Sequence, residues 1–342
     1  MTRRAWGAFA VASIVWGVPY LFIKIAVDGG VPPLALAWGR VTLAAVVLLA
    51  LAWRAGTLSM LRGGWRWLLA YAVAEISIPF PLIAAGEVHV ASSLAAIIVA
   101  AVPLVGAVLA IRFDESERPT PVRALGLLIG FGGVVVLVGI DVAGDVKELI
   151  GAGAILLATV GYAIGPMLVK HRLRGLDPRA TMGVSLAISS LLLAAPAVAD
   201  RPHSAPTIGA IGAVVFLGLV CTAAAFVIFT VLIGEAGTSR ATVITYINPV
   251  VAVGLGVAVL GERPGAGAVA GLLLILAGSW LSTDGRLPPA VRPLLARGAE
   301  RAERVRQVRR VARVSRVRRV ARVRRARQTP GPEPKTSRAT PL

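Results

Sequence analysis

Two ionisable side chains, Arg40 and Glu75, stand inside long apolar segments of this 342-residue sequence. In a helix rising 1.5 Å per residue, Arg40 lies about 10 Å from one end of its segment, and Glu75 about 15 Å from the same-side end of the next. Charged residues at such depth usually face a bundle interior or an aqueous cavity. Two interpretations stay open: a solute-binding or coupling site, and a structural ion pair that locks the two segments together.

Aromatic and cationic residues recur at helical spacing in the first segment, where Trp16, Tyr20 and Lys24 are four residues apart. This spacing puts them in one stripe on a helix. A later segment repeats the spacing from Tyr162 to Lys170. The stripe could form a cavity wall that stacks with a solute or attracts a carboxylate. Alternatively, the aromatic rings are packing or interfacial residues, and each lysine extends from a helix end toward water.

Further polar residues complete the predicted solute-binding or coupling set. Thr242, Tyr246 and Asn248 precede Pro249 and offer hydrogen-bonding groups where a proline can interrupt a helix. Tyr71 belongs to the same set. The full set is Trp16, Tyr20, Lys24, Arg40, Tyr71, Glu75, Tyr162, Thr242, Tyr246 and Asn248.

The residues needed for catalysis or for a cofactor are not arranged as those sites require. Cys221 is the only cysteine, and the three histidines are scattered between loops, so we expect no metal site. The sequence contains no His-Glu-x-x-His motif, no serine–histidine pair within one segment and no P-loop signature. We therefore predict no enzyme activity, no catalytic residues and no cofactor.

The elements that position these residues are long apolar helices. Hydrophobic residues make up 56% of the chain, charged residues 15%, and the mean hydropathy is +0.79. A bilayer core of about 30 Å needs about 20 apolar residues per helix. Polar or Pro/Gly-rich stretches divide the sequence into ten such segments, at 6–27, 32–53, 65–85, 90–111, 121–140, 149–169, 179–198, 208–233, 240–260 and 265–283. The sequence thus predicts an all-α integral membrane protein with ten transmembrane helices.

Positive charge is distributed unequally between the two sets of connecting segments. With the N-terminus inside, thirteen Lys/Arg residues fall on the inner side and three on the outer side. By the positive-inside rule, both termini are predicted to be cytoplasmic. The predicted location is the cell inner membrane, with multiple passes.

Most of the net charge of +19 belongs to residues 286–342, which contain 18 Lys/Arg and 3 Glu, a net +15. Valines recur there at every third residue from 305 to 323 and make no single apolar face on a helix. We interpret this stretch as a cytoplasmic low-complexity tail attracted to anionic lipid. Nucleic-acid binding is the alternative, but no aromatic residue is interleaved for base stacking, so we expect no specific nucleic-acid partner.

An internal repeat suggests two halves, 1–145 and 146–285. Glu117 is followed by glycines after 9 and 16 residues, and Glu262 is followed by glycines at the same spacings. Gly86-Glu87 likewise resembles Gly234-Glu235. Each half has five segments, so the second would enter the membrane upside down. Inverted repeats of this kind are common in secondary transporters, whose solute site lies between the halves.

Short motifs give the sequence a family resemblance over residues 6–283. They are Trp16-Gly17 with Lys24, Arg40, Ala91 to Ala96 leading to Pro103, Ser239-Arg240-Ala241 leading to Asn248-Pro249, and Gly261-Glu262-Arg263-Pro264. In these residues the chain resembles the EamA-like members of the drug/metabolite transporter superfamily. It departs from their pattern at residues 114–119, where no glycine precedes Glu117-Arg118 and one residue is added.

The resemblance implies a secondary transporter that moves, and more specifically exports, amino acids or related small metabolites across the inner membrane. It also implies a central cavity lined mainly by segments 1–4 and 6–9. A channel-like pore and a non-transporting membrane scaffold are the alternatives. The expected partners are a small-molecule metabolite and the lipid bilayer, and the sequence is compatible with a homodimer.

Overall fold

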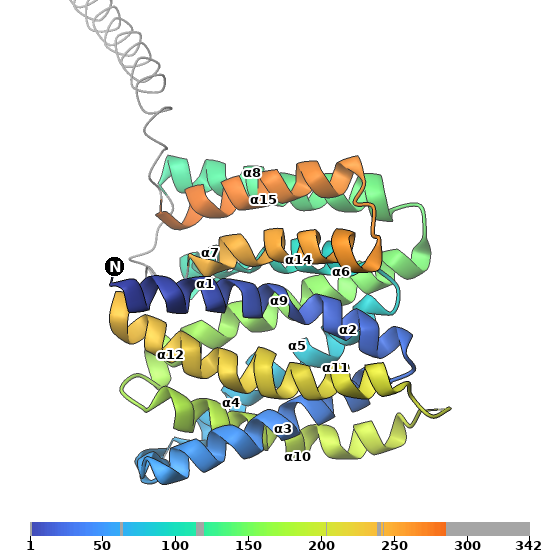
Figure 1. Ribbon diagram of the computed structural model, residues 1–342. Coiled ribbons are helices and arrows are strands. Elements are labelled where there is room, and N and C mark those ends of the chain that lie inside the picture. The colour runs from blue at the N-terminus through green and yellow to red at the C-terminus, as the bar shows by residue number, and fades with distance from the viewer. Residues whose placement is uncertain are drawn as a thin grey trace, which may run out of the picture. The chain divides into compact units, whose positions relative to one another are not determined.

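The computed structural model describes residues 2–61, 64–113, 120–202, 204–237, 241 and 243–284, and every regular element in these ranges is a helix (Figure 1). The predicted Arg-rich tail and Thr242 lie outside the described residues. The helices are α1 (Arg3–Gly17), α2 (Pro19–Asp28), α3 (Pro33–Arg54), η1 (Thr57–Leu61), α4 (Trp65–Tyr71), η2 (Ala72–Ser77), α5 (Pro79–Glu87), α6 (Ser92–Val99), α7 (Val102–Phe113), α8 (Pro121–Leu137), η4 (Val138–Val142), α9 (Val146–Arg172), α10 (Pro178–Ala199), α11 (Ile208–Gly218), η5 (Leu219–Ala224), α12 (Ala225–Ala236), α14 (Ile244–Leu260) and α15 (Ala266–Asp284).

Eight continuous or interrupted helices are long and apolar enough to cross a membrane, with mean hydropathies between 1.8 and 2.8. Two shorter apolar helices, Ile244–Leu260 and Ala266–Ser282, follow them. The prediction of an all-helical, apolar architecture is confirmed. Each apolar segment expected from the sequence corresponds to one of these ten helices, with ends that differ by a few residues.

Several of the long helices are interrupted rather than straight. Pro19 begins α2 directly after the end of α1, and Pro79 begins α5 directly after η2. Proline lacks an N–H and fits the first turn of a helix, so each one separates two helical pieces. Pro166 and Pro249, in contrast, lie inside the continuous helices α9 and α14.

Three interruptions are π-helical turns: η2, η4 and η5. A π-turn leaves backbone groups without their usual helical partners and is frequent at functional sites. In η2, the Ala72 carbonyl oxygen accepts a hydrogen bond from Ser189 Oγ of α10 at 3.1 Å. Ser77 Oγ donates to the same Ser189 Oγ at 3.0 Å. Side chains of α10 therefore stabilise the interruption in the neighbouring helix.

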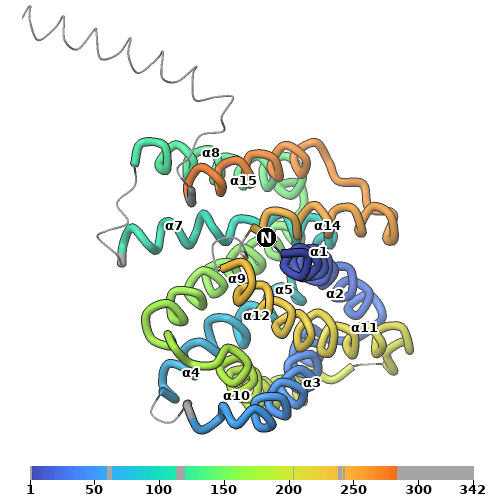
Figure 2. The backbone as a smooth tube through the Cα atoms, turned by 60° about the vertical axis from the view of Figure 1, so that its left-hand side comes forward, coloured from blue at the N-terminus to red at the C-terminus, as the bar shows by residue number. Residues whose placement is uncertain are grey.

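Helices α8 and α15 pack against each other along their length, away from α3 and α10 (Figures 1 and 2). Glycines allow this close approach. A Cβ at Gly278 would collide with the backbone of Gly130, and a Cβ at Gly133 would lie 2.9 Å from the Gly271 carbonyl oxygen.

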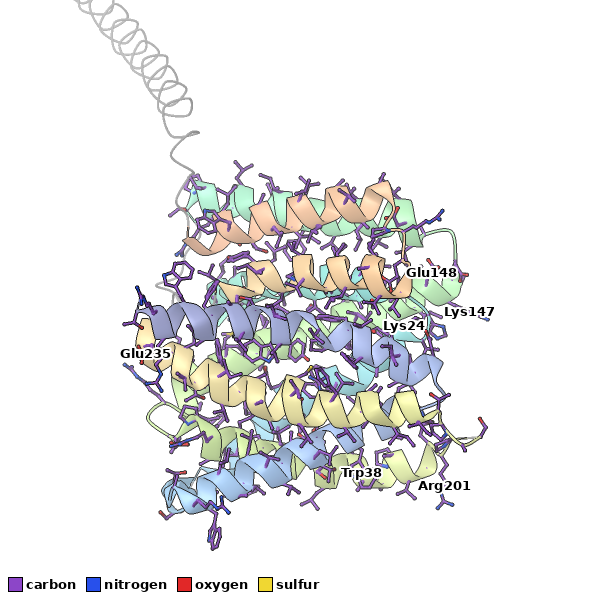
Figure 3. The ribbon with its side chains drawn as sticks, in the orientation of Figure 1. Lys24, Trp38, Lys147, Glu148, Arg201 and Glu235 are labelled. Atoms are coloured by element: carbon purple, nitrogen blue, oxygen red, sulfur yellow. The ribbon has the colours of Figure 1, made fainter. Side chains whose placement is uncertain are left out.

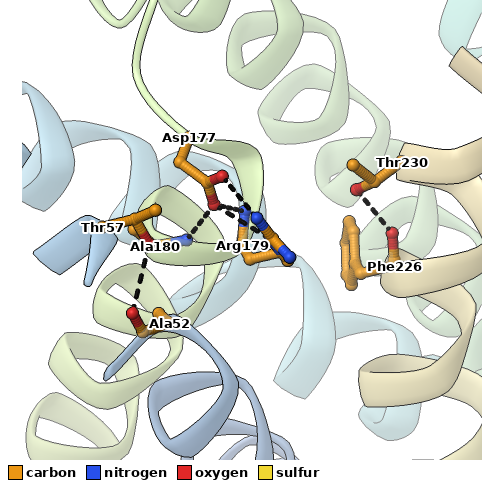
Figure 4. Close-up of polar contacts among 7 residues, drawn as sticks. All are labelled: Ala52, Thr57, Asp177, Arg179, Ala180, Phe226 and Thr230. Atoms are coloured by element: carbon orange, nitrogen blue, oxygen red, sulfur yellow. Dashed lines mark hydrogen bonds and ion pairs between the residues drawn. The ribbon is translucent and has the colours of Figure 1, made fainter. Parts of the chain in front are cut away.

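Side chains cap several helix starts, and Asp177 before α10 is an example (Figure 4). Its Oδ1 accepts from the backbone N–H groups of Arg179 at 2.9 Å and Ala180 at 3.1 Å. Arg179 Nη2 also donates to Asp177 Oδ2 at 3.0 Å. The hydrogen bond from the Arg179 side chain is the main cause that lowers the pKa of Asp177 from its ordinary value. In the same view, Thr230 Oγ1 donates to the Phe226 carbonyl oxygen at 2.8 Å.

The two ends of the helix bundle carry different labelled charges (Figure 3). Lys24, Lys147, Glu148 and Arg201 lie toward one end, which we call the Lys24 end. Glu235 lies at the other end, beside the N-terminus, and we call this the Glu235 end. There Glu235 accepts a hydrogen bond from Thr2 Oγ1 at 3.0 Å and pairs with Arg4 at 3.6 Å.

Candidate functional site

Arg40 lies inside the bundle with only 8% of its surface exposed. Its Nε donates to Thr222 Oγ1 of η5 at 2.8 Å, and its guanidinium carbon lies 4.1 Å from the centre of the Phe80 ring. Thr222 Oγ1 in turn donates to the Leu217 carbonyl oxygen at 2.8 Å, which fixes the hydroxyl. Among the described residues, Thr222 is the one hydrogen-bond partner of the guanidinium. The two terminal amino groups of Arg40 therefore remain able to bind an anion.

Two of the predicted tyrosines adjoin Arg40. Tyr162 of α9 interacts electrostatically with Arg40 and with Glu75, so its phenol lies near both charged groups. Tyr20 of α2 interacts with Arg40 and Tyr162. The Phe80 and Tyr162 rings meet edge to face at 6.5 Å. The Phe80 ring therefore contacts both the guanidinium and the Tyr162 ring.

Glu75 lies on η2, and its carboxyl group fills the space that Gly165 of α9 leaves open. A Cβ at residue 165 would collide with Glu75 Oε2. This oxygen is buried and has no hydrogen-bond partner in the described part of the chain. Tyr71, the last residue of α4, interacts electrostatically with Glu75. Glycine at position 165 is therefore required for the position of this carboxyl group.

Of the two interpretations of Arg40 and Glu75, the structural ion pair is not present in this structure. The salt bridges between described residues do not join Arg40 to Glu75. Arg40 instead uses Thr222 and the Phe80 ring, residues that are distant in sequence and that the hydropathy pattern does not single out. The two charges share the neighbour Tyr162 without contacting each other.

The remaining predicted residues lie in different surroundings. Trp16 packs against Phe226 and Phe229 of α12, with ring centres 5.6 and 4.6 Å away. The Asn248 amide, oriented to match its neighbours, donates to the carbonyl oxygens of Ser13 at 3.0 Å and Ile244 at 2.8 Å.

Tyr246 faces α15, where its ring lies 5.9 Å from that of Trp280. Electrostatic interactions link Tyr20, Arg40, Tyr71, Glu75 and Tyr162, whereas the ring contact of Tyr246 is with Trp280.

Lys24 occupies a polar position near the Lys24 end. Its Nζ donates to the Glu87 carbonyl oxygen at 2.9 Å and pairs with Asp28 Oδ1 at 3.1 Å. The ammonium group thereby connects α2 to the end of α5. The Glu87 carboxyl group itself is fully buried.

Two acidic residues missed by the site prediction cap helices at this end. Glu262 accepts hydrogen bonds from the backbone N–H groups of Ser92 at 2.7 Å and Ser93 at 2.9 Å, at the start of α6. Asp141 accepts from those of Gly267 at 3.3 Å and Ala268 at 2.5 Å, at the start of α15. Burial alone would raise the pKa of Glu262, but its hydrogen bonds to Ser92 and Ser93 outweigh burial and lower it. The Gly261-Glu262-Arg263-Pro264 motif was the sequence signal for the first cap.

The described residues contain no group of three His, Cys, Asp or Glu side chains that could hold a metal ion. What the arrangement offers is a buried cation beside hydroxyl groups and an acid.

Comparisons with known proteins agree with this membrane architecture. The chain is 30% identical over 268 residues to the uncharacterized inner membrane transporter YedA of Escherichia coli (strain K12), covering 75% of this chain and 83% of that protein. It is 29% identical over 291 residues to the "Probable terminal-alkyne amino-acid exporter" of Streptantibioticus cattleyicolor, covering 80% and 94%. A solved crystal structure matches with a TM-score of 0.60 and 23% identity, over 82% of this chain and 97% of the other.

The model of the EamA-like transporter family matches twice, at residues 5–139 and 149–283. The two matches together cover most of the chain and nearly all of its described helices. The resemblance inferred from short motifs is thereby confirmed, and this chain is a multi-pass membrane protein that belongs to the EamA-like transporter family.

Proposed function

We propose that this protein is a secondary transporter that exports amino acids or related small metabolites across the inner membrane by alternating access. The solute site is the cluster around Arg40, which we call the Arg40 site: Tyr20, Arg40, Tyr71, Glu75 and Tyr162. The proposed solute-binding set also includes Trp16, Lys24, Asn248 and Thr242, of which Thr242 lies outside the described residues. The Tyr246 ring lies beside that of Trp280 of α15, and we do not include Tyr246 in the Arg40 site.

One observation carries the proposal: Arg40 is a buried cation whose terminal amino groups have no hydrogen-bond partner among the described residues. Burying a cation this deep in an apolar bundle costs free energy, and such residues usually mark a binding or transport site. Thr222 and Phe80 hold the guanidinium in one orientation without using its two-pronged edge. That edge matches the geometry of a carboxylate.

The opposite charge supports the amino-acid class of solute. Glu75 presents a carboxyl group near the same tyrosine, Tyr162, that adjoins Arg40. A solute with one carboxylate and one ammonium group could interact with both residues at once. The name of the Streptantibioticus relative, an amino-acid exporter, supports the same class.

Several features support two inverted five-helix halves, residues 1–145 and 146–285. The family model matches once in each half. The π-helical turns η2 and η5 start 147 residues apart, and they carry Glu75 and Thr222 at the same place in the turn. Helices α3 and α10 both have 22 residues and begin with proline. In a transporter of this plan, the solute site lies between the halves and opens alternately to either side.

For orientation, the excess of Lys/Arg in one set of connecting segments supports cytoplasmic termini, with the Lys24 end outside. Residues 286–342, with their net charge of +15, would then be a separate cytoplasmic segment beside the anionic inner leaflet.

The test is exchange of labelled amino acids by the purified protein in lipid vesicles. We expect saturable uptake that unlabelled amino acid on the other side accelerates. Arg40→Gln should reduce this exchange at least tenfold, because hydrogen bonds to a charged group are worth about 1.5–3 kcal/mol. Arg201→Gln is the matched control, since Arg201 is exposed and its Nε donates locally to the Val198 carbonyl oxygen.

Other outcomes separate the rival functions. Flux that neither saturates nor responds to solute on the far side would identify a channel-like pore. Absence of flux and of ligand-induced thermal stabilisation across a broad metabolite panel would favour a scaffold.

A further inference from the structure

Glu87, the last residue of α5, is a fully buried acid that the solute site does not use. Both of its carboxyl oxygens are buried and lack a hydrogen-bond partner within the described ranges. The preceding residue, Gly86, fixes this position. A Cβ there would lie 2.8 Å from the Gly151 carbonyl oxygen and collide with Ile155, so α5 is held directly against α9. A carboxylate ion in these surroundings would lose its hydration without gaining a partner, which favours the protonated acid.

The groups that face Glu87 come from three neighbouring parts of the chain. Helix α2 contributes Lys24, Asp28 and Tyr20, α3 contributes Arg40, and the connection between α14 and α15 contributes Glu262. The contact face of α9 presents Gly151 and Ile155, which carry no charge.

The nearest cation is already engaged. Lys24 Nζ donates to the backbone carbonyl oxygen of Glu87, not to its carboxyl group, and pairs with Asp28. Asp28 pairs with Lys24, and Glu262 caps the start of α6, so both nearby carboxyl groups already have their own partners. The neutral form therefore suits this buried position, and the ionised form requires water or a new partner.

Glu87 contacts Lys24 through its backbone carbonyl oxygen and interacts electrostatically with Arg40. Tyr20 interacts electrostatically with both Glu87 and Arg40, and Arg40 itself acts on Glu87. An ionised Glu87 would therefore attract the same guanidinium that binds a solute carboxylate. Proton binding at Glu87 and solute binding at Arg40 are then linked, because each binding event changes the net charge next to the other binding group.

We infer that Glu87 is the proton-binding group that couples solute movement to a pH gradient. In its buried position, the Glu87 carboxyl group holds a proton. When water reaches it, the proton passes from the carboxyl oxygen to water, and no other bond changes. This inference rests on the proposed transporter function and adds the coupled ion to it.

The first test is independent of transport and of any solute. Infrared spectroscopy of the purified protein in lipid at neutral pH should show the carbonyl band of a protonated carboxylic acid. Glu87→Gln should remove that band, whereas Glu148→Gln, which changes an acid in the first turn of α9, should leave it. Glu75→Gln identifies any contribution from the other buried acid. A spectrum unchanged by Glu87→Gln would overturn the assignment.

The second test measures how far a pH gradient drives the accumulation of phenylalanine. Vesicles that carry the protein are given labelled phenylalanine and a difference of one pH unit across their membrane. One proton per solute supports up to about a tenfold solute gradient, because one pH unit is worth about 1.4 kcal/mol. Glu87→Gln should accumulate no gradient yet still exchange labelled for unlabelled phenylalanine. If it retains pH-driven accumulation, Glu87 is not the coupling group. If Glu87→Gln does not fold, Glu87→Asp replaces it, and this variant should keep coupling with a shifted pH dependence.

The two tests separate the inference from the function on which it rests. Failure of wild-type exchange for every amino acid tested would contradict the proposed function, while the infrared band would still report on Glu87. Exchange that is normal but equally pH-driven in wild type and Glu87→Gln would contradict the inference alone.

Discussion

At the scale of single residues, Glu75 distinguishes a transport role from a structural one. A structural pair with Arg40 would make Glu75→Gln costly, since an unpaired buried charge destabilises by about 3–5 kcal/mol. Arg40 is held by Thr222 and Phe80 instead. We therefore expect Glu75→Gln to leave thermal stability within about 1 kcal/mol of wild type, as for a substitution that breaks no network. Because glutamine cannot ionise, amino-acid exchange should fall.

Thermal unfolding and flux measured on the same preparation check this expectation. A variant as active as wild type would show that Glu75 serves neither transport nor coupling. A variant that unfolds at a much lower temperature would support an ion pair between Arg40 and Glu75 in another conformation of the bundle.

The sequence could identify Arg40 and Glu75 because a charge in an apolar run is visible without a structure. It could not identify Thr222, whose hydroxyl lies 182 positions away from Arg40 in the chain. In the sequence, Glu87 falls between the apolar segments 65–85 and 90–111, where an exposed acid is expected. Its burial depends on the contact between Gly86 and α9, which is a property of the assembled fold.

At the scale of helices, the packing of α8 on α15 depends on glycines whose backbones touch. A Cβ at Gly278 would lie 2.6 Å from the Gly126 carbonyl oxygen and closer still to backbone atoms of Gly130. Backbone atoms cannot move aside as a flexible side chain can. Gly278→Ala should therefore reduce stability by about 1–3 kcal/mol, the usual range for overpacking.

Gly132→Ala on α8 is the control, because nothing lies within 4 Å of a Cβ at that position. Thermal unfolding in lipid or detergent compares the two variants. Equal stability of both would mean that α8 and α15 do not pack this closely in the membrane.

The positions of these helices were predictable because a run of about 20 consecutive apolar residues indicates a membrane-spanning helix. The interruptions were predictable only in part. Proline indicates the breaks at Pro19 and Pro79, but Pro166 and Pro249 lie in unbroken helices. The π-turn η5 contains no proline at all, so its formation depends on tertiary contacts such as that from Arg40 to Thr222.

At the scale of the whole molecule, the orientation in the membrane determines which end of the bundle faces the cytoplasm. Thirteen Lys/Arg residues against three predict that the Lys24 end is outside. Two exposed positions report on the two ends: Val146 at the start of α9 and Ala55 after α3. Cys221 is buried, and Cys221→Ala removes its thiol from the assay.

In intact cells, a membrane-impermeant thiol reagent should label Val146→Cys and spare Ala55→Cys until the membrane is opened. Labelling of both in opened membranes is the control for accessibility. The reverse pattern would place the Lys24 end in the cytoplasm. That result would contradict the orientation predicted from the charge asymmetry.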